Sequence, residues 1–226
     1  MNSAISINPP TTEKELLENT AQIIGLSLQQ LANSLAIEVP ANQLKAKGWV
    51  GELMEARLGA TASSRPEPDF QNIGVELKTL PLDLHGKPKE STYVSTVPLR
   101  DNIGQTWEQS VVKLKLNRVL WVPVEADPSI VLSQRRIGKS FIWSPNQKEE
   151  NDLRADWQEL IDMITMGELH KINARQGKYL QIRPKAANAK ALSRTTLQTG
   201  ESGLTLPRGF YLRPAFTRML LDQYLS

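Results

Sequence analysis

The sequence predicts an α/β protein in which a mixed β-sheet is flanked by helices. Two observations lead to this fold class. Segments with apolar residues at helical spacing alternate along the chain with short segments rich in β-branched and aromatic residues. Residues 117–125 are apolar almost without interruption, as expected for a central strand covered on both faces. A chain of 226 residues with no internal repeat fits one large domain or two small lobes that share an interface.

The expected helices begin and end at residues that favour those positions. Thr12 and Ser27 each open a capping box, in which the residue three positions later is Glu or Gln, and Gly25 is the stop between two short helices. Gly167 ends a long amphipathic helix, and Pro214 suits the first position of the closing helix. The longer helices are expected at residues 49–58, 149–166 and 215–225.

Strands are expected where apolar and polar residues alternate or where apolar residues form short runs. Residues 74–80 alternate, and residues 92–97 are predicted to be their hairpin partner across a turn at 86–88. Further strands are expected at 117–125, 137–143, 177–183 and 207–213, the last as a short strand or hairpin arm.

The composition excludes several kinds of site. There is no cysteine, which excludes disulfides, thiol catalysis and Cys-ligated zinc. The two histidines, His85 and His170, have no partner in the sequence and are assigned to the surface or to a structural role. A bound metal would therefore need oxygen ligands, which favours Mg²⁺, Mn²⁺ or Ca²⁺. No secretory signal or membrane-length apolar segment is visible, so a soluble, cytoplasmic protein is expected.

Charge is distributed unevenly along the chain. Residues 171–226 carry ten Lys and Arg against two acidic residues, whereas residues 1–170 carry seventeen against twenty-two. A basic segment on an otherwise acidic chain indicates a polyanionic partner, although a solvated basic face would look the same. If carboxylates of residues 1–170 bind a metal ion, this acidic segment can lie beside a polyanion without repelling it.

Three residues near the first strand match the pattern PD-x(n)-(D/E)-x-K of metal-dependent nucleases. Glu76 and Lys78 are two apart, so they project from one face of the strand, and Asp69 enters from the preceding turn. The two carboxylates and the backbone carbonyl of Leu77 would form an oxygen site for Mg²⁺. Lys78 would hold or deprotonate the attacking water, and Glu55 on the preceding helix could add a carboxylate.

This motif is weak by itself, because its spacing is elastic. The alternative is an exposed Asp in a loop and a Glu–Lys pair on a solvated sheet face. Lys113 and Lys115, two residues apart, could contact phosphate or lie on a solvated face. Four tryptophans are assigned to the core: Trp107, Trp121, Trp143 and Trp157.

A basic stretch rich in small residues suits close approach to a DNA duplex. It runs over residues 183–190 and contains Arg183, Lys185, Asn188 and Lys190. Arg and Asn can pair bidentately with guanine and adenine edges, although a solvated loop would have the same composition. Two aromatic residues are candidates for reading a DNA groove or for half-buried packing, Tyr93 and Tyr211.

Taken together, six segments resemble the MutH family of mismatch-repair endonucleases, in the family's order and over nearly the whole chain. The most distinctive is the block at 183–192. The segments are KGWVG at 47–51, PDF at 68–70, GVELKT at 74–79, RVLWVPVE at 118–125, YLQIRPKAANAKAL at 179–192 and LPRGFYL at 206–212.

The resemblance implies a restriction-endonuclease-like fold, a single domain at 1–226 with two lobes around a DNA-binding cleft. The catalytic lobe includes about 45–145, and the basic DNA-reading lobe covers about 170–226. It implies Mg²⁺-dependent nicking of the unmethylated strand at hemimethylated GATC sites, 5′ to the G. Mn²⁺ is expected to substitute, and Ca²⁺ is not expected to support cleavage. The implied partners are double-stranded DNA containing GATC and MutL, which responds to MutS, and the protein is expected to be a monomer. The closing helix at 215–225 is a candidate MutL surface by resemblance alone.

Residue roles follow from the same resemblance. Asp69, Glu76 and Lys78 match the catalytic triplet, Glu55 an additional active-site acid and Lys115 an active-site lysine. The residues implied in contacting DNA are Lys47 and Gly48 in one turn, Arg183, Pro184 and Lys185 in a recognition loop, and Tyr211, which senses the methyl state of adenine. Tyr93 stands at a position where relatives can carry Phe, so the resemblance implies a DNA contact there without a detailed role.

Three other functions are consistent with parts of the sequence. A restriction enzyme that makes double-strand breaks at GATC would use the same triplet, but it needs two active sites, and no internal duplication is visible. A non-catalytic DNA-binding module is disfavoured because Asp69, Glu76 and Lys78 are all present. A phosphate-binding regulatory domain has no support, since neither GxxxxGK[ST] nor GxGxxG occurs.

Overall fold

The computed structural model describes residues 7–41, 48–62, 65–100, 102–185, 192–196 and 201–225. The chain forms two compact units that alternate along the sequence. Unit 1 comprises residues 1–90, 117–144 and 221–226, and unit 2 comprises residues 91–116 and 145–220. The lobes expected at about 45–145 and 170–226 divide the chain differently, because residues 91–116 belong to unit 2. In the described part of the chain, no helix is long and apolar enough to cross a membrane.

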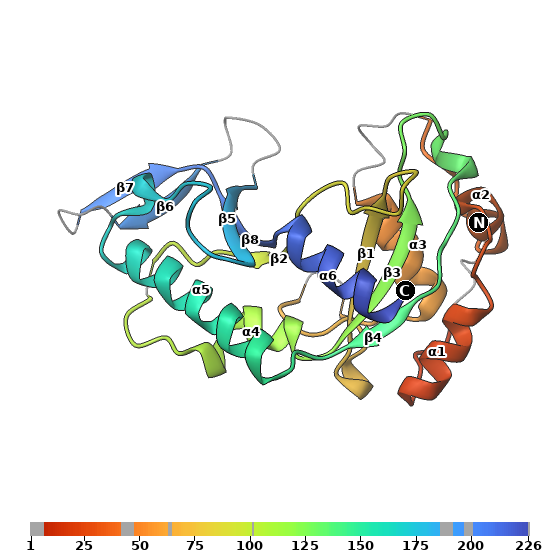
Figure 1. The fold of residues 1–226 in the computed structure, drawn as a ribbon, viewed down its shortest axis with the longest axis horizontal. Coiled ribbons are helices and arrows are strands. Elements are labelled where there is room, and N and C mark those ends of the chain that lie inside the picture. Colours follow the sequence, from red (N-terminus) through yellow and green to blue (C-terminus); the bar gives the residue numbers. More distant parts are fainter. Residues whose placement is uncertain are drawn as a thin grey trace. The chain divides into compact units, whose positions relative to one another are not determined.

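Unit 1 is built on a three-stranded mixed sheet with the order β1-β3-β4 (Figure 1). Its strands are β1 (Glu76–Leu82), β3 (Val119–Glu125) and β4 (Phe141–Trp143). β1 and β3 are parallel, with Glu76 opposite Val119, and β4 is antiparallel to β3. β3 is the central strand and is buried along almost its whole length, as its apolar sequence predicts.

The hairpin predicted between residues 74–80 and 92–97 is wrong. The chain does turn back after β1, since Lys87 and Asp83 are hydrogen-bonded and Leu82 bridges to Pro88. This contact ends within a few residues, and the free edge of β1 is instead used by β3. Residues 92–96 form β2 and pair with a strand near the C-terminus. The partner that pairs with the whole length of β1 is therefore the buried strand β3 and not the segment that is nearest in sequence.

Three helices cover one face of this sheet: α1 (Glu13–Ala21), α2 (Leu28–Ser34) and α3 (Trp49–Leu58). The capping box at Ser27 is complete, whereas Glu15 turns its side chain to the amide of Thr11 instead of closing the box at Thr12. Leu16, Leu31 and Leu53 of these helices pack against alternate residues of β3, among them Leu120 and Val122, to form one apolar core. This core fixes α3 against β1.

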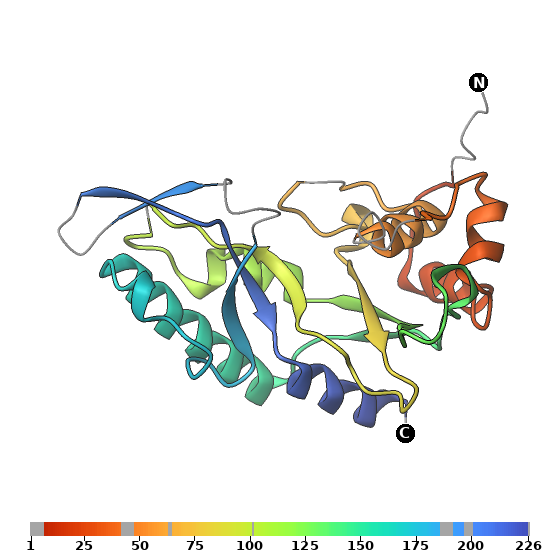
Figure 2. The same ribbon diagram turned by 90° about the horizontal axis from the view of Figure 1, so that it is seen from above.

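Unit 2 contains the antiparallel sheet β2-β8-β5 and a separate two-stranded ribbon. The sheet strands are β2 (Thr92–Thr96), β8 (Arg208–Leu212) and β5 (Leu180–Pro184), and the ribbon consists of β6 (Ser193–Thr196) and β7 (Ser202–Thr205). The helices are α4 (Val111–Leu116), α5 (Gln147–Thr165) and α6 (Pro214–Tyr224), whose last residues are assigned to unit 1. α5 packs against β5, and Figure 2 shows it along one side of the strands.

Short elements complete the two units. The 3-10 helices span Gln71–Ile73, Trp107–Gln109, Leu132–Gln134 and Leu169–Lys171. The predicted mixed sheet with flanking helices is confirmed, and so is the burial of the four tryptophans, each at most 3% exposed. α4 and the β6–β7 ribbon were not predicted. Expected strand 137–143 shortens to β4, with Ile137 held by an isolated bridge to Val124.

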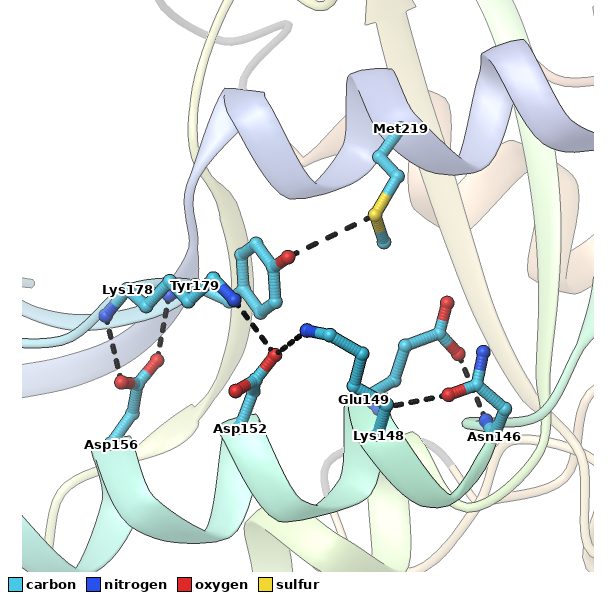
Figure 3. A network of polar contacts seen from close by, with 8 residues as sticks. All are labelled: Asn146, Lys148, Glu149, Asp152, Asp156, Lys178, Tyr179 and Met219. Carbon is cyan, nitrogen blue, oxygen red and sulfur yellow. Dashed lines mark hydrogen bonds and ion pairs between the residues drawn. The ribbon is translucent and has the colours of Figure 1, made fainter.

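A buried carboxylate on α5 holds the first residues of β5. Asp156, 6% exposed, accepts hydrogen bonds from the backbone amides of Lys178 and Tyr179 at 2.7 and 2.6 Å (Figure 3). It also accepts one from the amide of Leu180 at 2.8 Å. One turn earlier, Asp152 accepts hydrogen bonds from the ammonium groups of the exposed residues Lys148 and Lys178. Bonds from backbone amides to an ionised acceptor are among the stronger ones, so Asp156 sets where β5 begins.

We expect Asp156→Ala to lower the free energy of unfolding by about 2–4 kcal/mol, since three backbone amides lose a buried acceptor. Asp152→Ala, on the same helix, is the matched control and should cause a much smaller loss because its partners are exposed lysines. Urea denaturation of both variants measures the difference. Equal losses would show that the hydrogen bonds from backbone amides to Asp156 do not contribute more to stability than the surface ion pairs of Asp152.

Candidate active site

A tight turn before β1 brings Asp69 next to the strand that follows it. Phe70 and Val75 exchange backbone hydrogen bonds of 2.9 and 3.3 Å, and the 3-10 helix Gln71–Ile73 fills the space between them. Gly74 closes this turn at φ +65, a conformation that favours glycine. Because the turn is closed in this way, Asp69 Oδ2 accepts a 2.8 Å hydrogen bond from the amide of Leu77.

Glu76 and Lys78 lie on the same face of β1, as the two-residue spacing predicts. Lys78 Nζ is 2.5 Å from Glu76 Oε1, and both side chains are largely buried, at 11% and 2% exposed. Leu77 points to the opposite face, into the apolar core. The alternative of a solvated Glu–Lys pair is therefore excluded, and Asp69, only 6% exposed, is not a loop residue in solvent either.

Glu55 on α3 belongs electrostatically to the same group. Burial raises the pKa of its carboxyl, and the negative charges of Asp69, Glu52 and Glu76 raise the pKa further, while Lys78 lowers it. A carboxyl whose charge is opposed by several like charges is typical of a site that binds a cation. We call Asp69, Glu76, Lys78 and Glu55 the acidic cluster.

The donor atoms of the acidic cluster fit a hard divalent cation. All its anionic groups are carboxylates, which suit Mg²⁺, and a positive ion would relieve the repulsion felt by Glu55. Within the described residues, no three Asp, Glu, His or Cys side chains are arranged as a metal site by themselves. Coordination by Asp69 and Glu76 would therefore need further oxygens, such as the predicted carbonyl of Leu77, water or a substrate phosphate.

Lys115 and Gly48 are two further residues that the sequence predicts for the site. Lys115 is on α4 in unit 2, so its predicted role as an active-site lysine stays a prediction. Its neighbour Lys113 pairs with Glu150 of α5 at 3.0 Å, and this pairing accounts for Lys113 without phosphate. Gly48 is exposed at the start of α3. Three predicted DNA contacts lie outside the described residues: Lys47, Asn188 and Lys190.

A second group of predicted residues meets on the β2-β8-β5 sheet of unit 2. Tyr93 and Tyr211 are direct cross-strand partners, with ring centroids 5.4 Å apart in an edge-to-face arrangement. Lys185 Nζ lies 4.0 Å from the centroid of the Tyr93 ring and donates a 2.6 Å hydrogen bond to its hydroxyl. Arg183 Cζ is 6.0 Å from the centroid of the Tyr211 ring. We call these four residues the tyrosine cluster.

The cationic members of the tyrosine cluster are accessible, unlike the acidic cluster. Arg183, Pro184 and Lys185 are all exposed at the end of β5. Their side chains combine positive charge with aromatic faces, which is the combination that binds phosphates and bases. The arrangement therefore suits a polyanion better than a small apolar ligand.

Two residues of this surface, Ser91 and Gln181, were not predicted from the sequence. The Ser91 hydroxyl accepts hydrogen bonds from the Gln181 amide at 2.7 Å and from the Arg183 guanidinium at 3.2 Å. Gln181 could have been found, because it lies two residues before Arg183 on the same strand face. Ser91 lies far away in sequence, and no local pattern links it to β5.

Known proteins match most of this chain. The family described as "DNA mismatch repair enzyme MutH" matches residues 58–156. Proteins named "DNA mismatch repair protein MutH" from Escherichia coli strains K12, HS and EC4115 are each 52% identical over 218 residues, covering 96% of this chain and 95% of theirs. The chain belongs to the MutH family. The resemblance predicted from six short segments is thereby confirmed.

The MutH match bears directly on the acidic cluster. The matched residues 58–156 include Asp69, Glu76 and Lys78, and they also include Tyr93 and Lys115. Glu55 and the rest of the tyrosine cluster lie outside that segment, although the full-length relatives span 96% of the chain. The chain is thus a DNA mismatch repair enzyme by family, and its acidic cluster is the strongest candidate for the reacting centre.

The raised pKa of Glu55 predicts that its charge destabilises the folded protein. The folded state holds this proton more tightly than the unfolded chain, so stability falls as pH rises above the ordinary carboxyl value of 4.5. Glu55→Gln should therefore raise the melting temperature at pH 7 in EDTA, and the gain should shrink below pH 4.5. Thermal denaturation at both pH values measures this. Glu159→Gln, at an exposed helical position, is the control, and a lower melting temperature for Glu55→Gln at pH 7 would contradict the prediction.

Proposed function

We propose that this MutH family member is a Mg²⁺-dependent DNA endonuclease that nicks the unmethylated strand at hemimethylated GATC sites, 5′ to the G. The observation that carries the proposal is the meeting of Asp69, Glu76 and Lys78 at the start of β1. Family membership supports a role in DNA mismatch repair. The tyrosine cluster supports recognition of DNA rather than of a small substrate.

Each residue of the acidic cluster has a chemical task in this proposal. Asp69 and Glu76, with the Leu77 carbonyl, would hold Mg²⁺. Once bound, the ion supplies electrostatic stabilisation of the pentavalent phosphate and favours ionisation of water. Lys78, held beside Glu76, orients the attacking water or takes its proton, and its charge opposes the negative charge that develops on phosphate. Glu55 adds negative charge that strengthens cation binding.

The tyrosine cluster would read the DNA sequence. The Arg183 guanidinium can donate two hydrogen bonds to a guanine edge, and Lys185 can contact guanine or phosphate. Tyr211 would test the adenine of GATC by contact with the position that a methyl group occupies when the base is modified. Gly48 would contact DNA through its backbone. Side-chain contacts with base edges would read the sequence, whereas contacts with phosphates would position the protein on the DNA.

The proposed partners complete a methyl-directed repair reaction. The substrate is double-stranded DNA containing GATC, and MutL, acting downstream of MutS, would stimulate nicking. We propose that the protein acts as a monomer in the cytoplasm, where the chromosome of a bacterium lies. One active site per molecule accounts for cleavage of one strand rather than two.

A supercoiled-plasmid assay tests the proposal as a whole. Plasmids with unmethylated, hemimethylated or fully methylated GATC are incubated with the protein and Mg²⁺, with and without MutL. Open circles from the first two substrates only, in larger amount with MutL, are the expected result. Linear product that does not depend on MutL would favour a double-strand restriction enzyme. Binding without cleavage would leave a DNA-binding module.

Asp69→Ala should abolish nicking and leave DNA binding intact. The substitution removes a metal ligand, and it also removes a negative charge that repels phosphate. Asp127→Ala, at an exposed turn after β3, is the matched control and should nick normally. Nicking is followed on agarose gels and binding by gel shift in EDTA. A variant of Asp69 that nicks at the wild-type rate would refute the metal site.

Tyr211→Ser should reduce discrimination between methylated and unmethylated adenine more than it reduces the rate on the preferred substrate. The serine side chain is too short to reach the methyl position or to pair with the Tyr93 ring. The ratio of nicking rates on hemimethylated and fully methylated duplexes measures discrimination. Tyr93→Phe is the comparison, since it keeps the ring pair and removes only the hydroxyl contacts with Lys185 and Thr96. An unchanged ratio for Tyr211→Ser would show that Tyr211 does not sense the methyl state of adenine.

A further inference from the structure

The centre of the β2-β8-β5 sheet has a glycine where a side chain would be expected. Gly209 lies on the middle strand β8, paired with Thr96 of β2 on one side and with Arg183 of β5 on the other. A glycine inside a strand often marks a place where another group approaches the backbone closely. Here that group belongs to the tyrosine cluster.

Both tyrosine rings lie over the α-carbon of Gly209. A Cβ at this position would be 2.8 Å from Tyr211 Cε2, and 2.9 and 3.2 Å from Tyr93 Cε2 and Cδ2. These distances are shorter than van der Waals contact, so any side chain at 209 would occupy space that the two rings now fill. The backbone of Gly209 is not in the left-handed region, which leaves space as the reason for glycine.

The position of the rings in turn sets the position of the two cations. Lys185 is held to the Tyr93 hydroxyl and ring, and Arg183 lies beside the Tyr211 ring. The Tyr93 hydroxyl is also within 3.0 Å of Thr96 Oγ1. A displacement of either ring would therefore move a charged group that faces the DNA in the proposed function.

We propose that Gly209 is a specificity-determining positioning residue. Without a side chain, it lets Tyr93 and Tyr211 lie close against β8, and this placement presents Arg183 and Lys185 for base recognition. Gly209 need make no contact with DNA itself. The inference rests on the proposed function, because it assumes that the tyrosine cluster reads GATC.

The structure also predicts that this role can be separated from folding. The atoms that a Cβ would meet are edges of two tyrosine rings that are only partly buried, so they can move without breaking the sheet. Gly209→Ala should therefore fold normally while its rings are displaced. A loss of selectivity without loss of stability is an effect that a purely structural glycine would not produce.

The test compares binding of full-length wild type and Gly209→Ala to two short duplexes in EDTA. One duplex has a central GATC, and the other has the same composition with that site scrambled. We expect the ratio of the two dissociation constants to fall by about tenfold in the variant, which corresponds to about 1.4 kcal/mol, within the range of one base contact. Binding to the scrambled duplex should change little, since it depends on phosphate contacts. The melting temperature should stay near that of wild type.

A second measurement separates the rings from other effects of the extra methyl group. Gly209→Ala is repeated in a Tyr93→Leu background, where one of the two rings is absent. The added loss of selectivity should be smaller there than in wild type, because the clash with Tyr93 no longer exists. Equal losses in both backgrounds would overturn the proposal, as would full selectivity or an unfolded protein for Gly209→Ala alone. If wild type itself does not prefer GATC, the proposed function fails instead.

Discussion

One hydrogen bond, from the amide of Leu77 to the Asp69 carboxylate, ties the turn before β1 to the strand that carries Glu76 and Lys78. The turn can make this bond because it is closed by two backbone bonds and a single glycine. The strand is held in turn by β3, since the amide of Glu76 donates to the carbonyl of Arg118 at 2.9 Å. The acidic cluster thus depends on backbone contacts that the apolar core of unit 1 keeps out of water.

The two clusters differ in the sign of their charges and in how deeply these charges are buried. The acidic cluster gathers negative charge in a largely buried place, and Lys78 offsets part of this charge directly. The tyrosine cluster places two cations at the surface and supports them with aromatic rings and with the Ser91 hydroxyl. Burial makes charges interact strongly, which suits chemistry on a phosphate, whereas exposure leaves cations free to exchange their partners for DNA.

Patterns in the sequence predicted the helices and strands that are determined by contacts between residues close in sequence. Ser27 and its partner three residues later fixed the start of α2, and the apolar run of β3 predicted a central strand. The triplet at Asp69 was predictable because a turn and a strand of one short segment bring it together. The pairing of β1 with β3 could not be predicted, since it depends on burial against a segment that is distant in sequence. For the same reason no pattern pointed to Ser91, and the polar strands β6 and β7 lack an apolar alternation.

The alternation of the two units along the chain has a consequence for synthesis on the ribosome. The acidic cluster lies in the first ninety residues, but its sheet needs β3, which follows the first segment of unit 2. The sheet of unit 2 joins β2 to β8 near the C-terminus, and the closing residues of unit 1 come last of all. Such long-range pairing makes folding slow and late, because loops must close before their contacts form. An unfinished chain therefore holds neither cluster in its folded arrangement, and a stalled fragment lacks the acidic cluster to which we assign cleavage of DNA.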